Sequence, residues 1–200
     1  MNLRNALISI TLAVPLTASA GHGLMKAFGD VEWLPSPGRT PDQIGYIFDQ
    51  WEEHARLALA STSAERYTLS LQFAREKLAE IEFLVRRNEI ESAHVPIADY
   101  REYIAIAARE IATQDTLTQR KFNQQYAIAL LEHRYIMSVN YLDLPRRTRP
   151  LISRVIDAAI VQYELISPRL GDAFKASLFF KLEEVRWSWE VAQQADEQGL

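Results

Sequence analysis

Residues 40–87 read TPDQIGYIFDQWEEHARLALASTSAERYTLSLQFAREKLAEIEFLVRR and decide the fold class of this chain. In the second half of this stretch, apolar residues recur at gaps of three and four, a spacing that places side chains along one face of an α-helix. The polar residues between them fall mostly on the opposite side. The apolar stripe consists of Ala64, Tyr67, Leu71, Ala74, Leu78, Ile81 and Val85. The pattern predicts an amphipathic helix that buries one face.

The first half of the same stretch predicts a shorter helix, which would complete a helical hairpin. Thr40 and Pro41 are typical of a helix start, because threonine caps an N-terminus and proline fits the first turn. Ser61 to Ser63 would end this helix and cap the next one, which we expect to run to about Asn88. The face expected to pack inward carries Ile44, Phe48, Trp51, Ala55 and Ala58.

The rest of the chain shows the same periodicity, interrupted by proline, glycine and short polar stretches. We expect a third helix from Pro96, a fourth after residues 113–118, a fifth after residues 145–150 and a sixth after Gly171. Glycine is scarce and no strand-like alternation persists. We therefore predict an all-α fold, a six-helix antiparallel bundle built from helical hairpins over residues 41–200, in which a first unit (41–115) is extended by additional helices (116–198).

The first twenty residues predict a cleaved signal peptide over residues 1–20. Arg4 precedes an apolar run from Ala6 to Leu16, which is shorter than a membrane span, and small residues at 18–20 suit a signal peptidase. An uncleaved anchor is the alternative. Cleavage would leave a periplasmic or secreted chain that begins near Gly21. Residues 21–40 would form an irregular N-terminal arm, and we expect its Trp33 to be buried against the bundle.

Composition argues against several classes of function. The formal net charge is −4, from 22 Lys and Arg against 26 Asp and Glu, whereas nucleic-acid-binding domains are usually basic. The chain has no cysteine, so it has neither a disulfide nor a thiol nucleophile. It also lacks a G-x-S-x-G motif, a phosphate-binding loop and a dinucleotide fingerprint. We expect no enzymatic activity, no cofactor, no nucleic-acid partner and, after signal cleavage, no membrane span.

One histidine is a candidate metal or haem ligand. His133 lies on the predicted apolar face of the fourth helix, Met137 follows one turn later, and His54 is a candidate third member of the site. The alternative is a neutral, hydrogen-bonded histidine with a structural role, because the sequence places no second ligand beside it. Glu91 and His94 have the spacing found in di-iron bundles, but those sites need two such pairs.

Three arginines between two prolines form a first candidate partner-binding feature. Arg146, Arg147 and Arg149 give this connection a concentrated positive charge. They could contact anionic lipid headgroups or another acidic surface. The alternative is an ordinary solvated loop between two helices.

The sixth predicted helix is a second candidate for partner binding, because its apolar sector is wide. Trp187 and Trp189 lie about 200° apart around the helix axis, so that one neighbour cannot bury both. Phe179 adds a further large apolar side chain near the start of this helix. Either the helix is central in the fold, or one of its faces binds a partner.

Residues 34–100 carry short motifs in a fixed order. A proline turn, LPSP at 34–37, is followed by YIF at 46–48, by an E-x-x-R-L-x-L helix at 53–59, by an A-x-x-K-L-A-E helix at 74–80 and by IADY at 97–100. In this order they resemble a bacterial exported helical domain family of unknown function, over roughly residues 34–112. The chain departs from the family pattern at residues 38–45, where the proline turn and the tyrosine are further apart. The resemblance implies an envelope location and a helical fold, and it carries over no catalytic residue.

Taken together, the sequence favours a non-enzymatic, exported helical interaction or scaffold protein of the bacterial cell envelope, with a protein partner. The alternative is a periplasmic metal- or haem-binding helical bundle, with His133, Met137 and His54 as site residues. A visible absorption spectrum and a metal analysis of protein from its own host would separate the two hypotheses.

Overall fold

The computed structural model describes residues 27–29 and 31–199, which contain seven α-helices and no β-strand. The predicted all-α fold is therefore confirmed. Two short 3₁₀ helices, η1 (Tyr141–Asp143) and η2 (Ser167–Arg169), follow the fourth and fifth helices. The α-helices are α1 (Tyr46–Leu59), α2 (Ser63–Arg86), α3 (Ile90–Ala112), α4 (Thr116–Asn140), α5 (Arg149–Ile166), α6 (Asp172–Ser177) and α7 (Phe179–Glu197).

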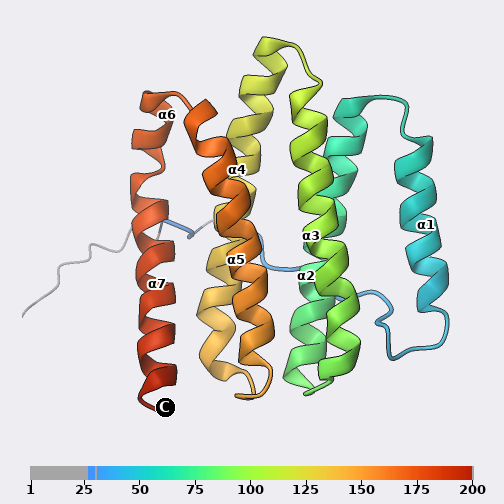
Figure 1. Cartoon of the computed structure of the whole chain (residues 1–200), viewed down its shortest axis with the longest axis vertical. Helices are drawn as coiled ribbons and strands as arrows, with labels where there is room; N and C mark the ends of the chain where they lie inside the picture. The colour runs from blue at the N-terminus through green and yellow to red at the C-terminus, as the bar shows by residue number, and fades with distance from the viewer. Residues whose placement is uncertain (1–26, 30, 200) are drawn as a thin grey trace, which may run out of the picture.

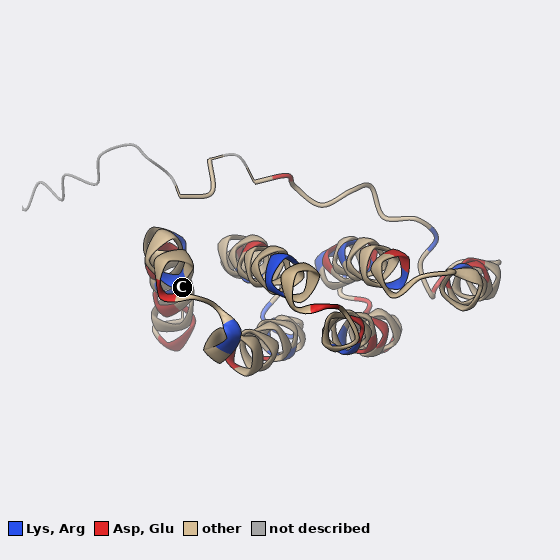
Figure 2. Ribbon diagram, turned by 90° about the horizontal axis from the view of Figure 1, so that it is seen from above, with Lys and Arg blue, Asp and Glu red and all other residues tan. Residues whose placement is uncertain are grey.

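The long helices run side by side in two layers (Figures 1 and 2). One layer contains α7, α4, α2 and α1 in that order, and the other contains α5 and α3, which pack on α4 and α2. The most extensive contact is that between α2 and α3, followed by those of α4 with α5 and with α7. α1 and α7 therefore lie at opposite ends of the four-helix layer, and each has a neighbour in that layer on one side only.

The core lies between the layers, where α2, α3, α4 and α5 meet. The stripe predicted over residues 64–85 does face this core, since Leu78, Ile81 and Val85 are fully buried. Tyr126 of α4 joins α4 to α3 across this core, because its hydroxyl donates to the Ile104 carbonyl oxygen at 2.7 Å. Burying one large apolar side chain stabilises a fold by about 1.5–3 kcal/mol. The periodicity of the central helices thus accounts for the position of the core.

The first helix begins later than predicted, at Tyr46. Gly45 has φ 95°, a left-handed conformation that interrupts an α-helix and that glycine adopts without strain. Thr40 does not cap the helix, because its side chain is buried and donates to Asp42. Residues 40–45 instead form a turn, in which the Gln43 N–H donates to the Thr40 carbonyl oxygen.

The third helix begins earlier than predicted, at Ile90, and Pro96 lies inside it. Proline has no N–H to donate to the Ser92 carbonyl oxygen, which weakens a helix at that point. Ala93, Pro96 and Ile97 are nevertheless all buried. Burial of this face on the core outweighs the lost hydrogen bond, so the helix continues through the proline.

The sixth predicted helix is divided into α6 and α7 at Leu178, so that the structure has seven helices where six were expected. The Leu178 N–H ends α6 by donating to the Phe174 and Lys175 carbonyl oxygens, and its own carbonyl oxygen accepts from Leu182 in α7. The Leu178 side chain is buried in the core. Anchoring of this residue accounts for the change in direction between the two helices.

The described part of the N-terminal arm runs along the outer side of the four-helix layer, from α7 towards α1 (Figure 2). Phe28 is buried and stacks on Tyr135 of α4, with ring centroids 4.3 Å apart. Trp33 was expected to be buried, but its side chain is 56% exposed. Arg75 holds the backbone here by donating to the Glu32 and Trp33 carbonyl oxygens, a restraint that does not involve the indole.

The predicted signal peptide lies outside the described residues. Within them, none of the helices combines the length and the apolar character that crossing a membrane requires.

Candidate interaction surface

α1 is attached to the rest of the molecule by a polar face. Its two buried residues are Tyr46 and Glu53, which point towards α2 and α3. Gln50 lies on the same side, and its Nε2 donates to Asp99 of α3 at 3.0 Å. A surface helix of a globular protein normally turns an apolar stripe inward. In α1 the groups that face the bundle are instead largely hydrogen-bonding and charged.

Lys77 of α2 is the centre of this polar contact. Its side chain is fully buried, and its Nζ lies 2.8 Å from Glu53 Oε1 and 2.8 Å from Glu80 Oε1. Tyr103 of α3 donates its hydroxyl to Glu53 Oε2 at 2.7 Å, and the Tyr46 hydroxyl donates to Glu80 Oε2 at 3.2 Å. We call these five residues the Lys77 network. It links α1, α2 and α3 and provides both carboxylates with a cation and a hydroxyl donor.

The Lys77 network has shifted proton affinities. Burial raises the pKa of Glu80 to about 7, and the opposing effect of Lys77 does not cancel this shift. Burial also acts to lower the pKa of Lys77, but Glu80 and Glu53 outweigh it, so that this pKa is raised. Burial and the nearby carboxylates raise the pKa of Tyr46, which therefore stays protonated and able to donate. Removing one partner of such a buried pair would leave an uncompensated charge, so the network ties the position of α1 to those of α2 and α3.

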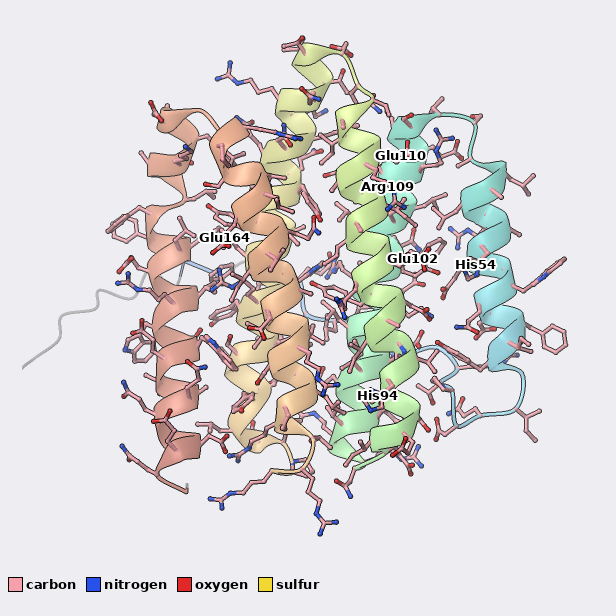
Figure 3. All side chains as sticks on the ribbon, in the orientation of Figure 1. His54, His94, Glu102, Arg109, Glu110 and Glu164 are labelled. Atoms are coloured by element: carbon pink, nitrogen blue, oxygen red, sulfur yellow. The ribbon has the colours of Figure 1, made fainter. Side chains whose placement is uncertain are left out.

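The opposite face of α1 is apolar and exposed, which reverses the prediction for this helix. Phe48 and Trp51 were expected to pack inward, yet their side chains are 71% and 76% exposed. Ring side chains project from α1 away from the bundle (Figure 3). The prediction was wrong because the polar residues of α1 find buried partners in α2 and α3, so that these residues face inward. The exposed large apolar residues of this outer face are Ile47, Phe48, Trp51 and Leu59, and Ile44 is also exposed in the turn just before α1.

The candidate residues of α7 divide between the surface and the core. Trp187 is 63% exposed and Phe179 is also exposed, and Phe180 beside it completes an aromatic pair. Trp189 instead packs edge-on against Tyr141, with ring centroids 5.0 Å apart. As expected from their angular separation, the two tryptophans are not buried together. Phe179 and Trp187 remain candidates for partner binding, whereas Trp189 is largely committed to the fold.

The three candidate arginines are not equivalent. Arg146 and Arg147 are exposed, whereas Arg149 is buried at the start of α5. The Arg149 guanidinium donates to Asp196 of α7 and to the Leu142 carbonyl oxygen. The inclusion of Arg149 in a partner-binding surface is therefore wrong, because its charge is used inside the molecule to hold η1 against α7.

The candidate metal ligands lie on different parts of the structure. His133 is buried in α4, and its Nδ1 lies 3.2 Å from the Tyr100 hydroxyl. Burial lowers the pKa of His133 to about 3, so the ring is neutral at physiological pH. Met137 is buried one turn later, but His54 is exposed on α1, beyond α2 (Figures 2 and 3). Among residues 27–29 and 31–199, no three His, Cys, Asp or Glu side chains lie close enough to hold a metal ion.

Sequence reasoning missed the Lys77 network and two members of the outer face, Ile47 and Leu59. A signal for the network exists in α2 as a second stripe at gaps of three and four, on the side that faces α1. This stripe consists of Ser70, Phe73, Lys77, Glu80 and Leu84, all of which are buried. Because Lys77 and Glu80 are charged, they look like solvent-facing positions when only apolar residues are followed.

Comparison with known proteins supports the helical resemblance. No curated protein and no solved structure matches the chain. A family model described as "Domain of unknown function (DUF5667)" matches residues 38–134. The match covers α1, α2, α3 and most of α4, so it extends further than the predicted limit near residue 112 and includes His133. Residues 38–134, which contain the Lys77 network and the outer face of α1, are thus similar to this family of unknown function.

Proposed function

We propose that this chain is a non-enzymatic, exported helical interaction protein of the bacterial cell envelope, which binds protein through the outer face of α1. The observation that carries this proposal is the orientation of α1. Tyr46 and Glu53 are buried in the Lys77 network, and Phe48 and Trp51 are held in solvent. Adjacent exposed large apolar side chains of this kind mark interaction sites in soluble proteins.

The charge pattern of α1 favours a protein over a membrane surface as the partner. Helices that lie on anionic membranes carry Lys and Arg beside their apolar face. Apart from the buried Glu53, α1 has Asp49 and Glu52 against a single Arg56. Aromatic anchors on a helix are also typical of the residues that dominate binding at protein interfaces.

Site-specific photocrosslinking in the native host tests the binding role. A photoreactive residue at position 48 should give a discrete protein adduct, and Trp51→Glu should abolish it. The same probe at Gln72, which is exposed on α2, measures random collisions, and a probe at Trp187 reports on α7. Equal labelling from positions 48 and 72 would contradict the proposal, and adducts from position 187 alone would move the binding surface to α7.

The cellular location is tested separately by fractionation and mass spectrometry. We expect the chain in the envelope or secreted fraction, with an N-terminus near Gly21. A cytoplasmic chain that retains residues 1–20 would contradict export, whatever the crosslinking result.

A further inference from the structure

We propose that the outer face of α1 binds α1 of a second copy of this chain, in an antiparallel pair related by a twofold axis. This inference rests on the proposed function and names its partner. Three properties of α1 identify α1 of a second copy, running in the opposite direction, as the partner that covers its outer face. They are the gradient of side-chain size along the helix, the charges on one flank and the position of α1 at the end of a layer.

The outer face of α1 has large residues in its first half and small residues in its second. Phe48 and Trp51 are followed by Ala55 and Ala58, and Leu59 ends the helix. If a twofold axis passes level with residues 53–54, Trp51 of one copy lies over Ala55 and Ala58 of the other, and Phe48 lies beside Leu59. Such insertion of large side chains over small ones is how helices pack closely. A parallel pair would place Trp51 on Trp51 and leave the alanines facing one another.

The same arrangement brings opposite charges together. Asp49, Glu52 and Arg56 lie along one flank of α1, where Asp49 pairs with Arg39 of the same chain at 2.8 Å and the Arg56 guanidinium lies over the Phe73 ring of α2. In an antiparallel pair, the two copies of this flank lie on the same side of the plane that contains the two helix axes. Arg56 of one copy is then level with Asp49 and Glu52 of the other. In a parallel pair, this flank would face the flank that carries His54. The charges of α1 are thus compatible with the antiparallel pair, but they add little affinity, because exposed ion pairs are weak and Asp49 and Arg56 already have contacts within their own chain.

The position of α1 leaves room for this pairing. No described segment covers its outer face, because α1 ends the four-helix layer (Figure 2). A twofold pair is closed, and closed symmetry is the usual form of soluble homo-oligomers. A contact between α1 of one copy and α7 of the next would instead build an open filament. With 14 residues, α1 is about 21 Å long, so the interface is small and we expect dissociation in the micromolar range.

Sedimentation equilibrium of the purified protein, from micromolar to submillimolar concentration, tests whether the dimer exists. We expect Trp51→Glu to raise the dissociation constant at least tenfold, as loss of a central aromatic anchor does. Trp187→Glu makes the same change at an exposed site of α7 and should leave the constant unchanged. Circular dichroism checks that both variants are folded. A monomer throughout the range would overturn the inference, and so would a dimer that only Trp187→Glu disrupts.

Engineered cysteines test the direction of the pair, and the chain has no cysteine of its own to interfere. Ile47 and Ala58 lie on the same side of the outer face, and the proposed register brings residue 47 of one copy near residue 58 of the other. A mixture of Ile47→Cys and Ala58→Cys chains, told apart by mass, should give the mixed disulfide. Ala58→Cys alone should not crosslink, because its two copies would be about 13.5 Å apart along the helix axis. A disulfide between two Ala58→Cys chains would indicate a parallel pair and overturn the proposed arrangement.

These experiments separate failure of the dimer from failure of the proposed function. A monomeric chain that still gives a specific adduct from position 48 with another envelope protein contradicts only the dimer. A monomeric chain that gives no specific adduct contradicts both.

Discussion

The two ends of the four-helix layer are attached in opposite ways. α7 buries Val185 and Ala192 against α4, and it adds the edge-on contact of Trp189 with Tyr141. α1 buries Tyr46 and Glu53, which belong to the Lys77 network, while Ile47, Phe48, Trp51 and Leu59 face solvent. The α7 end is thus held mainly by apolar burial, and the α1 end mainly by paired charges and hydrogen bonds.

This difference shows what decides the orientation of an end helix. Apolar burial is non-directional, so a helix such as α7 tolerates some exposed aromatic residues while its other face packs. A buried lysine with two carboxylates is directional, because removing one partner leaves an uncompensated charge. The Lys77 network can therefore hold α1 with its apolar face outward, a position that hydrophobic packing alone would not select.

Loss of the central cation should have the largest effect on the α1 end. Lys77→Met leaves Glu53 and Glu80 buried without their cation, and we expect a loss of about 3–5 kcal/mol in the free energy of unfolding. Urea denaturation followed by circular dichroism measures this loss. Adding Glu53→Gln and Glu80→Gln to Lys77→Met should recover more than half of it, because neutral amides can still accept from Tyr46 and Tyr103. Failure to recover would mean that packing of the lysine stem, and not charge pairing, holds α1.

The second largest effect should be a pH dependence of stability that is caused by Glu80. Its pKa is about 7 in the folded protein against 4.5 for an ordinary glutamate, so the folded state binds more protons between these values. The free energy of unfolding should therefore fall as pH rises from about 4.5 to about 7, by roughly 3 kcal/mol at most from this group. The measurement is urea denaturation at several pH values for the wild type and for Glu80→Gln, which lacks the titrating group.

The variant is needed because His133 titrates in the opposite sense. Its pKa is about 3 in the folded protein, against 6.5 for an ordinary histidine, so the unfolded state binds more protons. The free energy of unfolding therefore falls as pH drops below 6.5. Glu80→Gln leaves His133 in place, so the difference between the two proteins isolates Glu80. A difference that stays constant from pH 4.5 to 7 would show that Glu80 does not titrate as expected.

At the α7 end, removal of the indole of Trp189 should produce a smaller loss. Because Trp189 is only partly buried, we expect Trp189→Ala to lower the free energy of unfolding by about 2 kcal/mol, below the range for a fully buried tryptophan. The loss should show no dependence on pH between 4.5 and 7, because no titrating group is removed. A pH-dependent loss would mean that the α7 end also depends on charge pairing, for instance through Arg149 and Asp196.

These contrasts explain which parts of the structure could be predicted from the sequence. The stripe from Tyr67 to Val85 predicted the core face of α2 correctly, because apolar residues at helical spacing bury together. In α1, the same rule identified the apolar face but assigned it the wrong direction. Periodicity shows which residues share a face, whereas direction depended here on Lys77 and Glu80, which come from another helix. Likewise, the spacing of Trp187 and Trp189 showed that both could not be buried, and only the position of Tyr141 decided between them.

The smallest effect on stability is expected on the outer face of α1, and it separates folding from binding. Phe48→Ser changes a side chain that is 71% exposed and therefore makes little contact with the described part of its own chain. The free energy of unfolding, measured at a protein concentration where the chain is monomeric, should change by no more than about 0.5 kcal/mol. Trp187→Ser is the matched change at the α7 end and should be equally neutral. If Phe48→Ser lowered the stability of the monomer by several times this amount, α1 would turn this side chain inward in solution, and the difference between the two ends would disappear.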